Sequence, residues 1–335
     1  MRLSVLDQSP VSEGSSGTQA LANTLDLARL TDQLGYHRYW VAEHHGGTML
    51  AGPAPEVLIG PIAAATERIR VGSGGVMLPH YSPYKVAEVF AVLSGLHPGR
   101  IDMGLGRASG TDPLTTFALQ RDRRQASPDD FPNQLAELLG YLDGTVPEDH
   151  PFSVLGLPTE QRPVPWMLGS SPQSAIWADE LNLRYAFADF INPGGAGLGL
   201  QKAPEAVAVW ALAADTDEEA QRLASSSRMT LRELRQGRLI PVPSPERALA
   251  YLGDSRESFG GRRAVIGTPE KVRAGLEEVM ESYGAEEVIV VTITYDHEAR
   301  RRSYELIAEA CGLQAAHIQP THPLTTTVTK LLQAP

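Results

Sequence analysis

The sequence predicts an α/β protein built as a single (β/α)8 barrel. Short apolar segments recur along the 335 residues, and continuous apolar runs are typical of parallel strands that are buried on both faces. Amphipathic or connecting segments separate these runs, and no linker rich in Pro, Gly and Ser divides the chain. One barrel therefore accounts for the whole pattern.

Eight strand candidates define the barrel, and the helices between them have recognisable ends. The helix that begins near Thr18 is predicted to end at Gly35, since glycine favours the C-cap conformation. Pro83 begins a helix in which Val86, Phe90 and Leu93 share one face. The strand candidates are residues 3–6, 39–42, 69–72, 100–105, 164–168, 183–190, 207–212 and 288–292.

Three segments depart from this alternation. Residues 107–163 and 225–266, after the fourth and seventh strands, are long for single connections, and long insertions in such a barrel usually line or cover its mouth. The link 191–204 between the sixth and seventh strands is short for a parallel crossover. Its four glycines and two prolines predict no stable helix, and a weakened barrel wall if the short link is real. We assign residues 1–312 to the barrel and 313–335 to a C-terminal extension.

Composition limits the classes of function. The net charge of −11 argues against a partner such as nucleic acid or an anionic membrane. The single cysteine, Cys311, excludes an intramolecular disulfide and a metal site built from cysteines. No apolar run approaches the roughly 20 residues that span a bilayer, and the first residues resemble a strand rather than a signal peptide. We expect a cytoplasmic protein.

Two adjacent histidines follow the second strand, where a barrel of this kind has its active face. His44 and His45 are neighbours on extended backbone, so their side chains point to opposite sides. The chain has no His-x-His and no His-Glu-x-x-His motif, which makes a shared metal an unfavoured interpretation. One of the two can transfer protons near neutral pH. The alternative is that both are hydrogen-bonded loop residues.

The third strand carries glycines where a barrel wall normally has side chains. Gly74 and Gly75 indicate either close approach of a flat ligand or a bend of the strand. The next strand ends in Gly104-Leu105-Gly106, which does not fit a dinucleotide fingerprint because the third glycine comes one residue late. It does place a cation, Arg107, directly after the strand.

The turn after the fifth strand is typical of a phosphate site. Gly169, Ser170 and Ser171 lie between a strand and a helix, and Ser171 can cap that helix. Backbone N–H groups there, with the hydroxyls of both serines and of Ser174, form an anion site. An ordinary capped helix is the alternative. Together with Arg107 on the neighbouring strand, the turn favours a cofactor that bears a phosphate.

Taken together, these motifs resemble the bacterial luciferase-like flavin monooxygenases. The resemblance extends from Leu3 to about Glu309 and depends on the order and spacing of short motifs rather than on any one of them. These motifs are Glu43-His44-His45 and residues 72–79, 98–107, 169–171, 213–220 and 267–270. Relatives have a full helix between the sixth and seventh strands, so the link 191–204 is a departure from the family pattern.

The resemblance implies a TIM-type barrel that binds reduced FMN, often supplied by a separate flavin reductase. It implies that oxygen adds to the flavin C4a and that the peroxide oxidises a small organic substrate. Family members often dimerise, so we expect a homodimer. The alternatives are a deazaflavin (F420)-dependent oxidoreductase that needs no oxygen, a non-catalytic flavin-binding protein, and a scaffold without cofactor.

The resemblance also implies roles for individual residues. His44 matches the active-site histidine, a candidate acid/base near the flavin. Gly74-Gly75 matches the place where relatives carry a non-proline cis peptide against the isoalloxazine ring. The residues implied to bind the cofactor are Gly74, Gly75, Arg107, Gly169, Ser170, Ser171 and Ser174, with no metal ligands.

Overall fold

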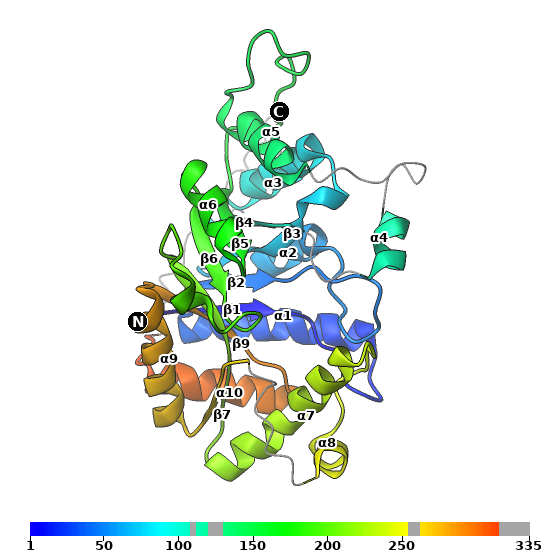
Figure 1. The fold of residues 1–335 in the computed structure, drawn as a ribbon, viewed down its shortest axis with the longest axis vertical. Coiled ribbons are helices and arrows are strands. Elements are labelled where there is room, and N and C mark those ends of the chain that lie inside the picture. The colour runs from blue at the N-terminus through cyan, green and yellow to red at the C-terminus, as the bar shows by residue number, and fades with distance from the viewer. Residues whose placement is uncertain (108–111, 120–129, 254–261, 315–335) are drawn as a thin grey trace, which may run out of the picture.

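The computed structural model describes residues 1–107, 112–119, 130–253 and 262–314. Eight parallel strands form a closed barrel in the order β6-β5-β4-β3-β2-β1-β9-β7, and β7 pairs back to β6 (Figure 1). This confirms the predicted (β/α)8 fold. The barrel strands are β1 (Arg2–Asp7), β2 (Arg38–Val41), β3 (Arg70–Met77), β4 (Ile101–Gly106), β5 (Val164–Gly169), β6 (Arg184–Ala188), β7 (Ala206–Ala213) and β9 (Glu287–Val291).

Helices connect the strands and begin and end largely where the sequence predicts. Gly35 ends the first helix in the left-handed conformation, with φ of 88°, and the Ser82 hydroxyl accepts a hydrogen bond from the N–H of Lys85 at the start of the third. The helices are α1 (Gly17–Leu34), α2 (Pro55–Ala64), α3 (Pro83–Leu96), α4 (Pro113–Leu119), α5 (Phe131–Asp143), α6 (Pro172–Glu180), α7 (Asp217–Arg235), α8 (Pro245–Leu252), α9 (Pro269–Tyr283) and α10 (His297–Ala310), with 3-10 turns η1 (Leu78–His80) and η2 (Gly195–Leu198).

Alternation along each strand separates two apolar layers. One set of strand side chains packs against the helices in the main core, as Val5, Tyr39 and Val71 do. The other set points into the barrel, where the rings of Trp40 and Trp166 meet edge to face with centroids 5.3 Å apart. The interior is therefore a packed core at mid-height rather than a channel.

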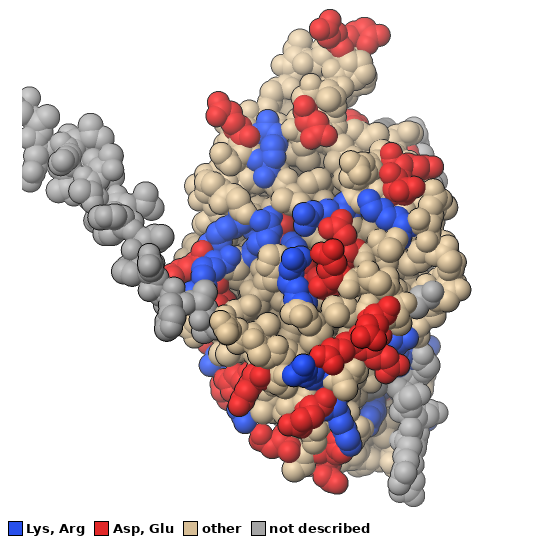
Figure 2. All heavy atoms as spheres, turned by 90° about the vertical axis from the view of Figure 1, so that its left-hand side faces the viewer, with Lys and Arg blue, Asp and Glu red and all other residues tan. Residues whose placement is uncertain are grey.

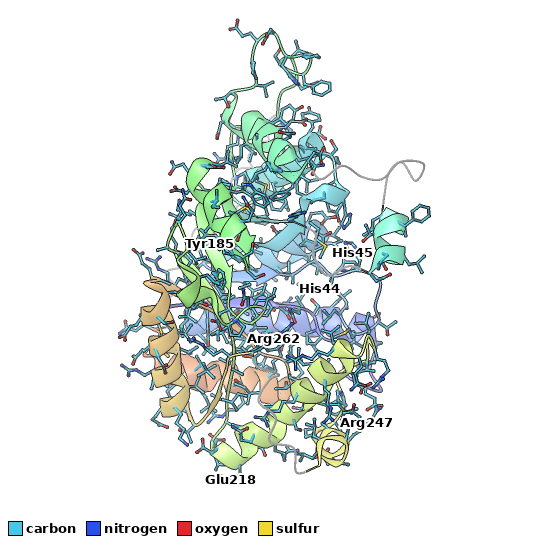
Figure 3. All side chains as sticks on the ribbon, in the orientation of Figure 1. His44, His45, Tyr185, Glu218, Arg247 and Arg262 are labelled. Carbon is cyan, nitrogen blue, oxygen red and sulfur yellow. The ribbon has the colours of Figure 1, made fainter. Side chains whose placement is uncertain are left out.

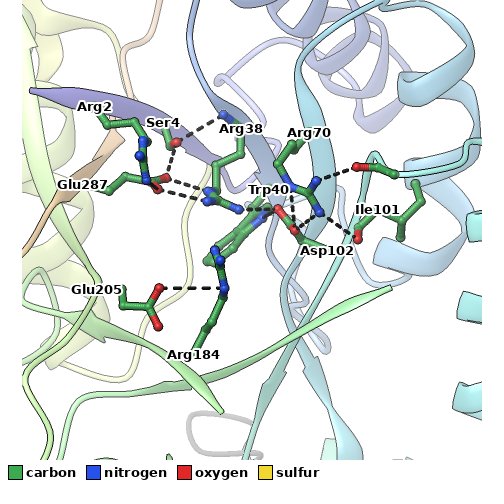
Figure 4. A network of polar contacts seen from close by, with 11 residues as sticks. Arg2, Ser4, Arg38, Trp40, Arg70, Ile101, Asp102, Arg184, Glu205 and Glu287 are labelled. Atoms are coloured by element: carbon green, nitrogen blue, oxygen red, sulfur yellow. Dashed lines mark hydrogen bonds and ion pairs between the residues drawn. The ribbon is translucent and has the colours of Figure 1, made fainter. Parts of the chain in front are cut away.

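A buried ionic network fills the amino end of the barrel interior (Figure 4). The Arg38 guanidinium donates to Asp102 Oδ2 at 2.7 Å and to Glu287 Oε1 at 2.6 Å. Arg70 donates to the other oxygen of Asp102 at 2.6 Å. All of these groups lie near the starts of parallel strands, so they occupy one end of the interior. Space for a ligand is left at the carboxyl end.

The link between β6 and β7 contains no α-helix in residues 191–204, as its composition predicts, and only the short turn η2 forms there. The barrel is nevertheless closed, because β6 and β7 pair in parallel register from Ala186 with Ala206 to Ala188 with Ala208. A weakened wall at this link stays a prediction.

A ninth strand, β8 (Ala264–Gly267), was not predicted from the sequence. It pairs with the carboxyl half of β7, from Trp210 to Ala213. β6 pairs only with residues 206–208 of β7, so β8 extends the wall beyond the point where β6 ends. This strand lies at the end of the long insertion 225–266 that follows the seventh barrel strand, which also contains the second half of α7 and all of α8.

Both long insertions approach the loop after β2. A Cβ on Gly46 would overlap the Thr115 hydroxyl of α4, and one on Gly47 would lie 3.1 Å from Leu239 Cδ1. The C-terminal extension predicted for 313–335 lies outside the described residues from residue 315 onward. Within the described ranges, no helix has both the length and the apolarity needed to cross a membrane.

Candidate active site

A cavity of about 510 Å³ lies at the carboxyl ends of the barrel strands. Inward-facing apolar side chains such as Leu6, Trp40 and Ile289 form its floor. Every site residue that the sequence and the resemblance single out lines this one cavity. These residues are His44, Gly74, Gly75, Arg107, Gly169, Ser170, Ser171 and Ser174.

The wall of the cavity at β3 is formed by backbone. The Gly74–Gly75 peptide bond is cis, which confirms the expectation from the resemblance. A Cβ on Gly74 would lie 3.1 Å from Trp40 Cβ, and one on Gly75 would lie 2.7 Å from the Gly104 carbonyl oxygen. Neither position has room for a side chain, so this wall is flat.

The turn after β5 forms a second side of the cavity. Ser171 occupies the N-cap position of α6, yet its side chain makes no capping hydrogen bond, so the predicted cap is present in position only. The Ser174 hydroxyl donates to the Ser171 carbonyl at 2.6 Å and contacts the Tyr185 hydroxyl at 3.0 Å. A Cβ on Gly169 would overlap the Ser174 side chain, which is why this position requires glycine.

The arrangement around this turn suits an anion. Arg107 directly follows β4 and lines the cavity with an exposed side chain. The α6 N-terminus carries the partial positive charge of the helix dipole, and Gln173 in its first turn also lines the cavity. The Ser170 carbonyl accepts a hydrogen bond from Asn192 Nδ2 at 2.9 Å, so the short β6–β7 link helps to hold the turn.

The two adjacent histidines have different surroundings (Figure 3). His44 lines the cavity, and its Nδ1 is buried with no hydrogen-bond partner among the described residues. Burial, with a smaller contribution from His45, lowers the pKa of His44 to about 4, so its ring is neutral at pH 7. His45 instead pairs with Glu43, with Nε2 2.7 Å from Oε1. Of these two histidines, His44 is therefore the one available to a ligand in the cavity.

Some cavity residues were not identified from the sequence. Phe190 and Ile191 line the cavity from the loop after β6. Their position just past a strand end, like that of His44 after β2, is the signal that could have found them. Glu43 also lines the cavity, although the sequence marks it only as part of a motif. Within the described ranges, no three His, Cys, Asp or Glu side chains are grouped to hold a metal ion.

Comparison with known proteins identifies one family over most of the chain. The model of the family described as luciferase-like monooxygenase matches residues 1–287. The uncharacterized protein YwcH of Bacillus subtilis (strain 168) is 47% identical, and the match covers 92% of this chain and 98% of that protein. The N-acetyl-S-alkylcysteine monooxygenase of the same organism is 40% identical, over 77% of this chain and 81% of its own.

A solved structure extends the likeness to three dimensions. The crystal structure of apo-MsnO8 superposes with a TM-score of 0.83 at 40% identity, and the match covers 93% of this chain and 98% of that one. Family model, relatives and structure each span most of the barrel. The chain therefore belongs to the luciferase-like monooxygenase family.

Proposed function

We propose that this protein is a flavin-dependent monooxygenase that uses reduced FMN and O2 to oxidise a small organic substrate. A separate flavin reductase supplies the reduced FMN. One observation carries the cofactor assignment: a single cavity joins a flat backbone wall at Gly74–Gly75 to an anion-binding turn at Ser170 and Ser171. These are the two features that a flat ring system with a phosphate at one end requires.

Different lining residues bind the ring and the phosphate of the cofactor. The Gly74–Gly75 wall would take the isoalloxazine ring, and Arg107 with Ser170 and Ser171 would hold the phosphate. Ser174 and Gly169 shape the turn, because the Ser174 hydroxyl already donates to the Ser171 carbonyl. When bound, reduced FMN supplies the electrons that activate oxygen.

His44 is the group that we assign to proton transfer. Its ring is neutral at pH 7, and its buried Nδ1 has no partner among the described residues, so it can form a hydrogen bond with a group in the cavity. Among the described lining residues, the charged side chains are Glu43 and Arg107. The rest of the lining is largely apolar, which favours an organic substrate that presents an uncharged, apolar portion to the reacting centre and which helps to exclude water.

The test is reconstitution of the purified protein with reduced FMN or with reduced F420 and no substrate, followed by substrate screening. We expect saturable binding of reduced FMN. With a flavin reductase present, we expect products that are heavier by one oxygen atom in a mass-spectrometric screen. N-acetyl-S-alkylcysteines belong in that screen because a relative is named for them. Binding of F420 alone would instead indicate the deazaflavin oxidoreductase, and tight FMN binding without product would indicate a non-catalytic flavin-binding protein.

A further inference from the structure

The Glu43 carboxylate accepts three hydrogen bonds beneath the cavity wall. His45 Nε2 and the Tyr81 hydroxyl each lie 2.7 Å from Oε1, and the N–H of Met77 lies 2.8 Å from Oε2. The side chain of Glu43 has no solvent exposure. A buried carboxylate with three donors has its hydrogen-bonding capacity well satisfied. Removing it would leave these three polar groups without this partner.

The three donors belong to segments that form different parts of the site. Met77 ends β3, two residues after the Gly74–Gly75 wall. Tyr81 follows η1, which leaves that strand. His45 adjoins His44 on the loop after β2. Glu43 therefore joins the loop that carries His44 to the end of the strand that forms the flat wall.

The geometry also sets the tautomer of the His45 ring. Both oxygens of Glu43 act as acceptors, Oε1 for Tyr81 and Oε2 for Met77, so the His45 nitrogen that faces Oε1 is Nε2 with its hydrogen. The ring is held further by an edge-to-face contact with His80, with centroids 6.1 Å apart. The backbone of the preceding residue is also held, because the N–H of His44 donates to the Gly52 carbonyl at 3.1 Å.

We propose that Glu43 is a positioning residue of the active site, which orients His44 and the Gly74–Gly75 wall through its hydrogen bonds to His45, Tyr81 and Met77. This inference rests on the proposed function only in that the ligand of the cavity is flavin. Glu43 itself contacts no reacting atom in the proposal. It acts through the segments that it holds.

The experiment compares Glu43→Gln with two matched variants. Glu43→Gln keeps the size of the side chain and one acceptor for Met77, but it removes the carboxylate oxygen to which His45 and Tyr81 donate. Tyr81→Phe deletes one of the three donors and leaves the carboxylate in place. Glu56→Gln is the charge control, because Glu56 is a half-buried carboxylate close enough to raise the pKa of Tyr81 and has no hydrogen bond to this group among the described residues.

Two readouts are measured on each folded variant: the Kd for reduced FMN under anaerobic conditions, and the His45 tautomer from 15N-histidine NMR. We expect Glu43→Gln to weaken FMN binding about tenfold and to abolish the Nε2–H signal of His45. Tyr81→Phe should cause a smaller loss of about threefold with the tautomer kept, and Glu56→Gln should change neither readout.

The outcomes separate this inference from the proposed function. If the wild-type protein binds no reduced FMN, the proposed function fails, while the NMR signal of His45 still tests what Glu43 holds. Wild-type binding together with unchanged affinity and tautomer in Glu43→Gln would overturn the positioning role. An equal loss in Glu56→Gln would also overturn it, since local charge alone would then explain the effect.

Discussion

At the scale of single residues, the surroundings of His44 determine the pH range in which it can act. Burial and the neighbouring His45 lower its pKa to about 4, so the neutral ring persists well below pH 6.5. A histidine with an unperturbed pKa near 6.5 would be about 3% neutral at pH 5, which would cost a neutral-His mechanism roughly thirtyfold in rate. The buried site thus extends the active pH range on the acid side.

We predict that the single-turnover rate with saturating reduced FMN changes by less than about twofold between pH 8 and pH 5. The rate should then fall as the pH drops through the pKa of His44, near 4. His44→Ala should lower this rate about a hundredfold or more at every pH, within the usual range for loss of an acid–base group. A rate that halves near pH 6.5 would contradict the assignment of a neutral His44.

The lowered pKa also makes the stability of the fold depend on pH. The unfolded chain protonates His44 near pH 6.5, whereas the folded chain does so only near pH 4. The unfolded state therefore binds more protons between these values, and the contribution of His44 to stability is lost as the pH falls from 6.5 to 4. His44→Gln has no titrating ring at this position, so its stability lacks this contribution. The variant is the control that separates acid unfolding from loss of the neutral ring in the rate profile.

A second prediction at this scale concerns Arg107 as a phosphate ligand. Arg107→Met keeps a side chain of similar length and removes the charge, so we expect FMN binding to weaken about tenfold to a hundredfold, as for loss of a charge-assisted hydrogen bond. Riboflavin has the same ring and no phosphate and is the control ligand. Its affinity, measured by the same anaerobic titration, should not change, and an equal loss for both ligands would show that Arg107 does not read the phosphate.

At the scale of elements, the short β6–β7 link replaces a crossover helix with a single turn. Its Gly195 lies against Phe187 of β6, where a Cβ would overlap the aromatic ring, and the ring of Phe187 packs on Tyr283 of α9 with centroids 5.2 Å apart. Backbone rather than an amphipathic helix therefore covers this part of β6. Fewer apolar contacts at a strand lower the free energy of its local opening.

We therefore predict that amides of β6 exchange with solvent faster than those of β1 in hydrogen–deuterium exchange. Gly195→Ala should accelerate exchange in β6 further and lower the free energy of unfolding by about 1–3 kcal/mol, the usual cost of overpacking. Gly197→Ala, in the same turn with no neighbour within 4 Å of its Cβ, is the matched control and should have little effect. Equal protection of β1 and β6 in the wild-type protein would mean that the wall is not weakened.

The elements that the sequence reveals are those with a local signal. All eight barrel strands are recognisable in the sequence as short, mainly apolar segments. Gly35 marks the end of α1 because glycine readily adopts the left-handed backbone conformation found there. The strand β8 was missed because it has four residues and gains its order from pairing with β7, more than 50 residues away in the chain. Long-range pairing of that kind leaves no periodicity to read.

The site shows the same division between local and long-range information. The sequence placed Gly74, Arg107 and Ser171 in one cavity because each directly follows or belongs to a strand end. It could not show that the Ser174 hydroxyl is engaged by the Ser171 carbonyl, since that depends on the geometry of the turn. The Arg38–Asp102 pair was also missed, because charged residues at strand starts look solvent-exposed until the barrel closes around them.

At the scale of the whole molecule, the exposed apolar surface says more about a partner than the charge does. On the face shown in Figure 2, acidic and basic side chains are interspersed, so that face offers no broad region of a single charge. The neighbouring helices α2 and α3 carry exposed apolar side chains, since Val57, Val92 and Leu96 are 65%, 45% and 68% exposed. Such side chains on adjacent helices suit a contact with a second copy more than contact with water.

We predict a homodimer in which α2 and α3 form the contact. Sedimentation equilibrium should give twice the 36.1 kDa of one chain, and Leu96→Glu should shift the protein to monomer, because it places a charge in an apolar contact. Leu249→Glu is the matched control, since Leu249 is 45% exposed on α8, which packs on α7 at the other end of the molecule from α3 (Figure 1). Thermal stability should be unchanged in a Leu96→Glu monomer at low protein concentration, where the wild type also dissociates. A monomeric wild-type protein, or dissociation caused by Leu249→Glu, would rule out this interface.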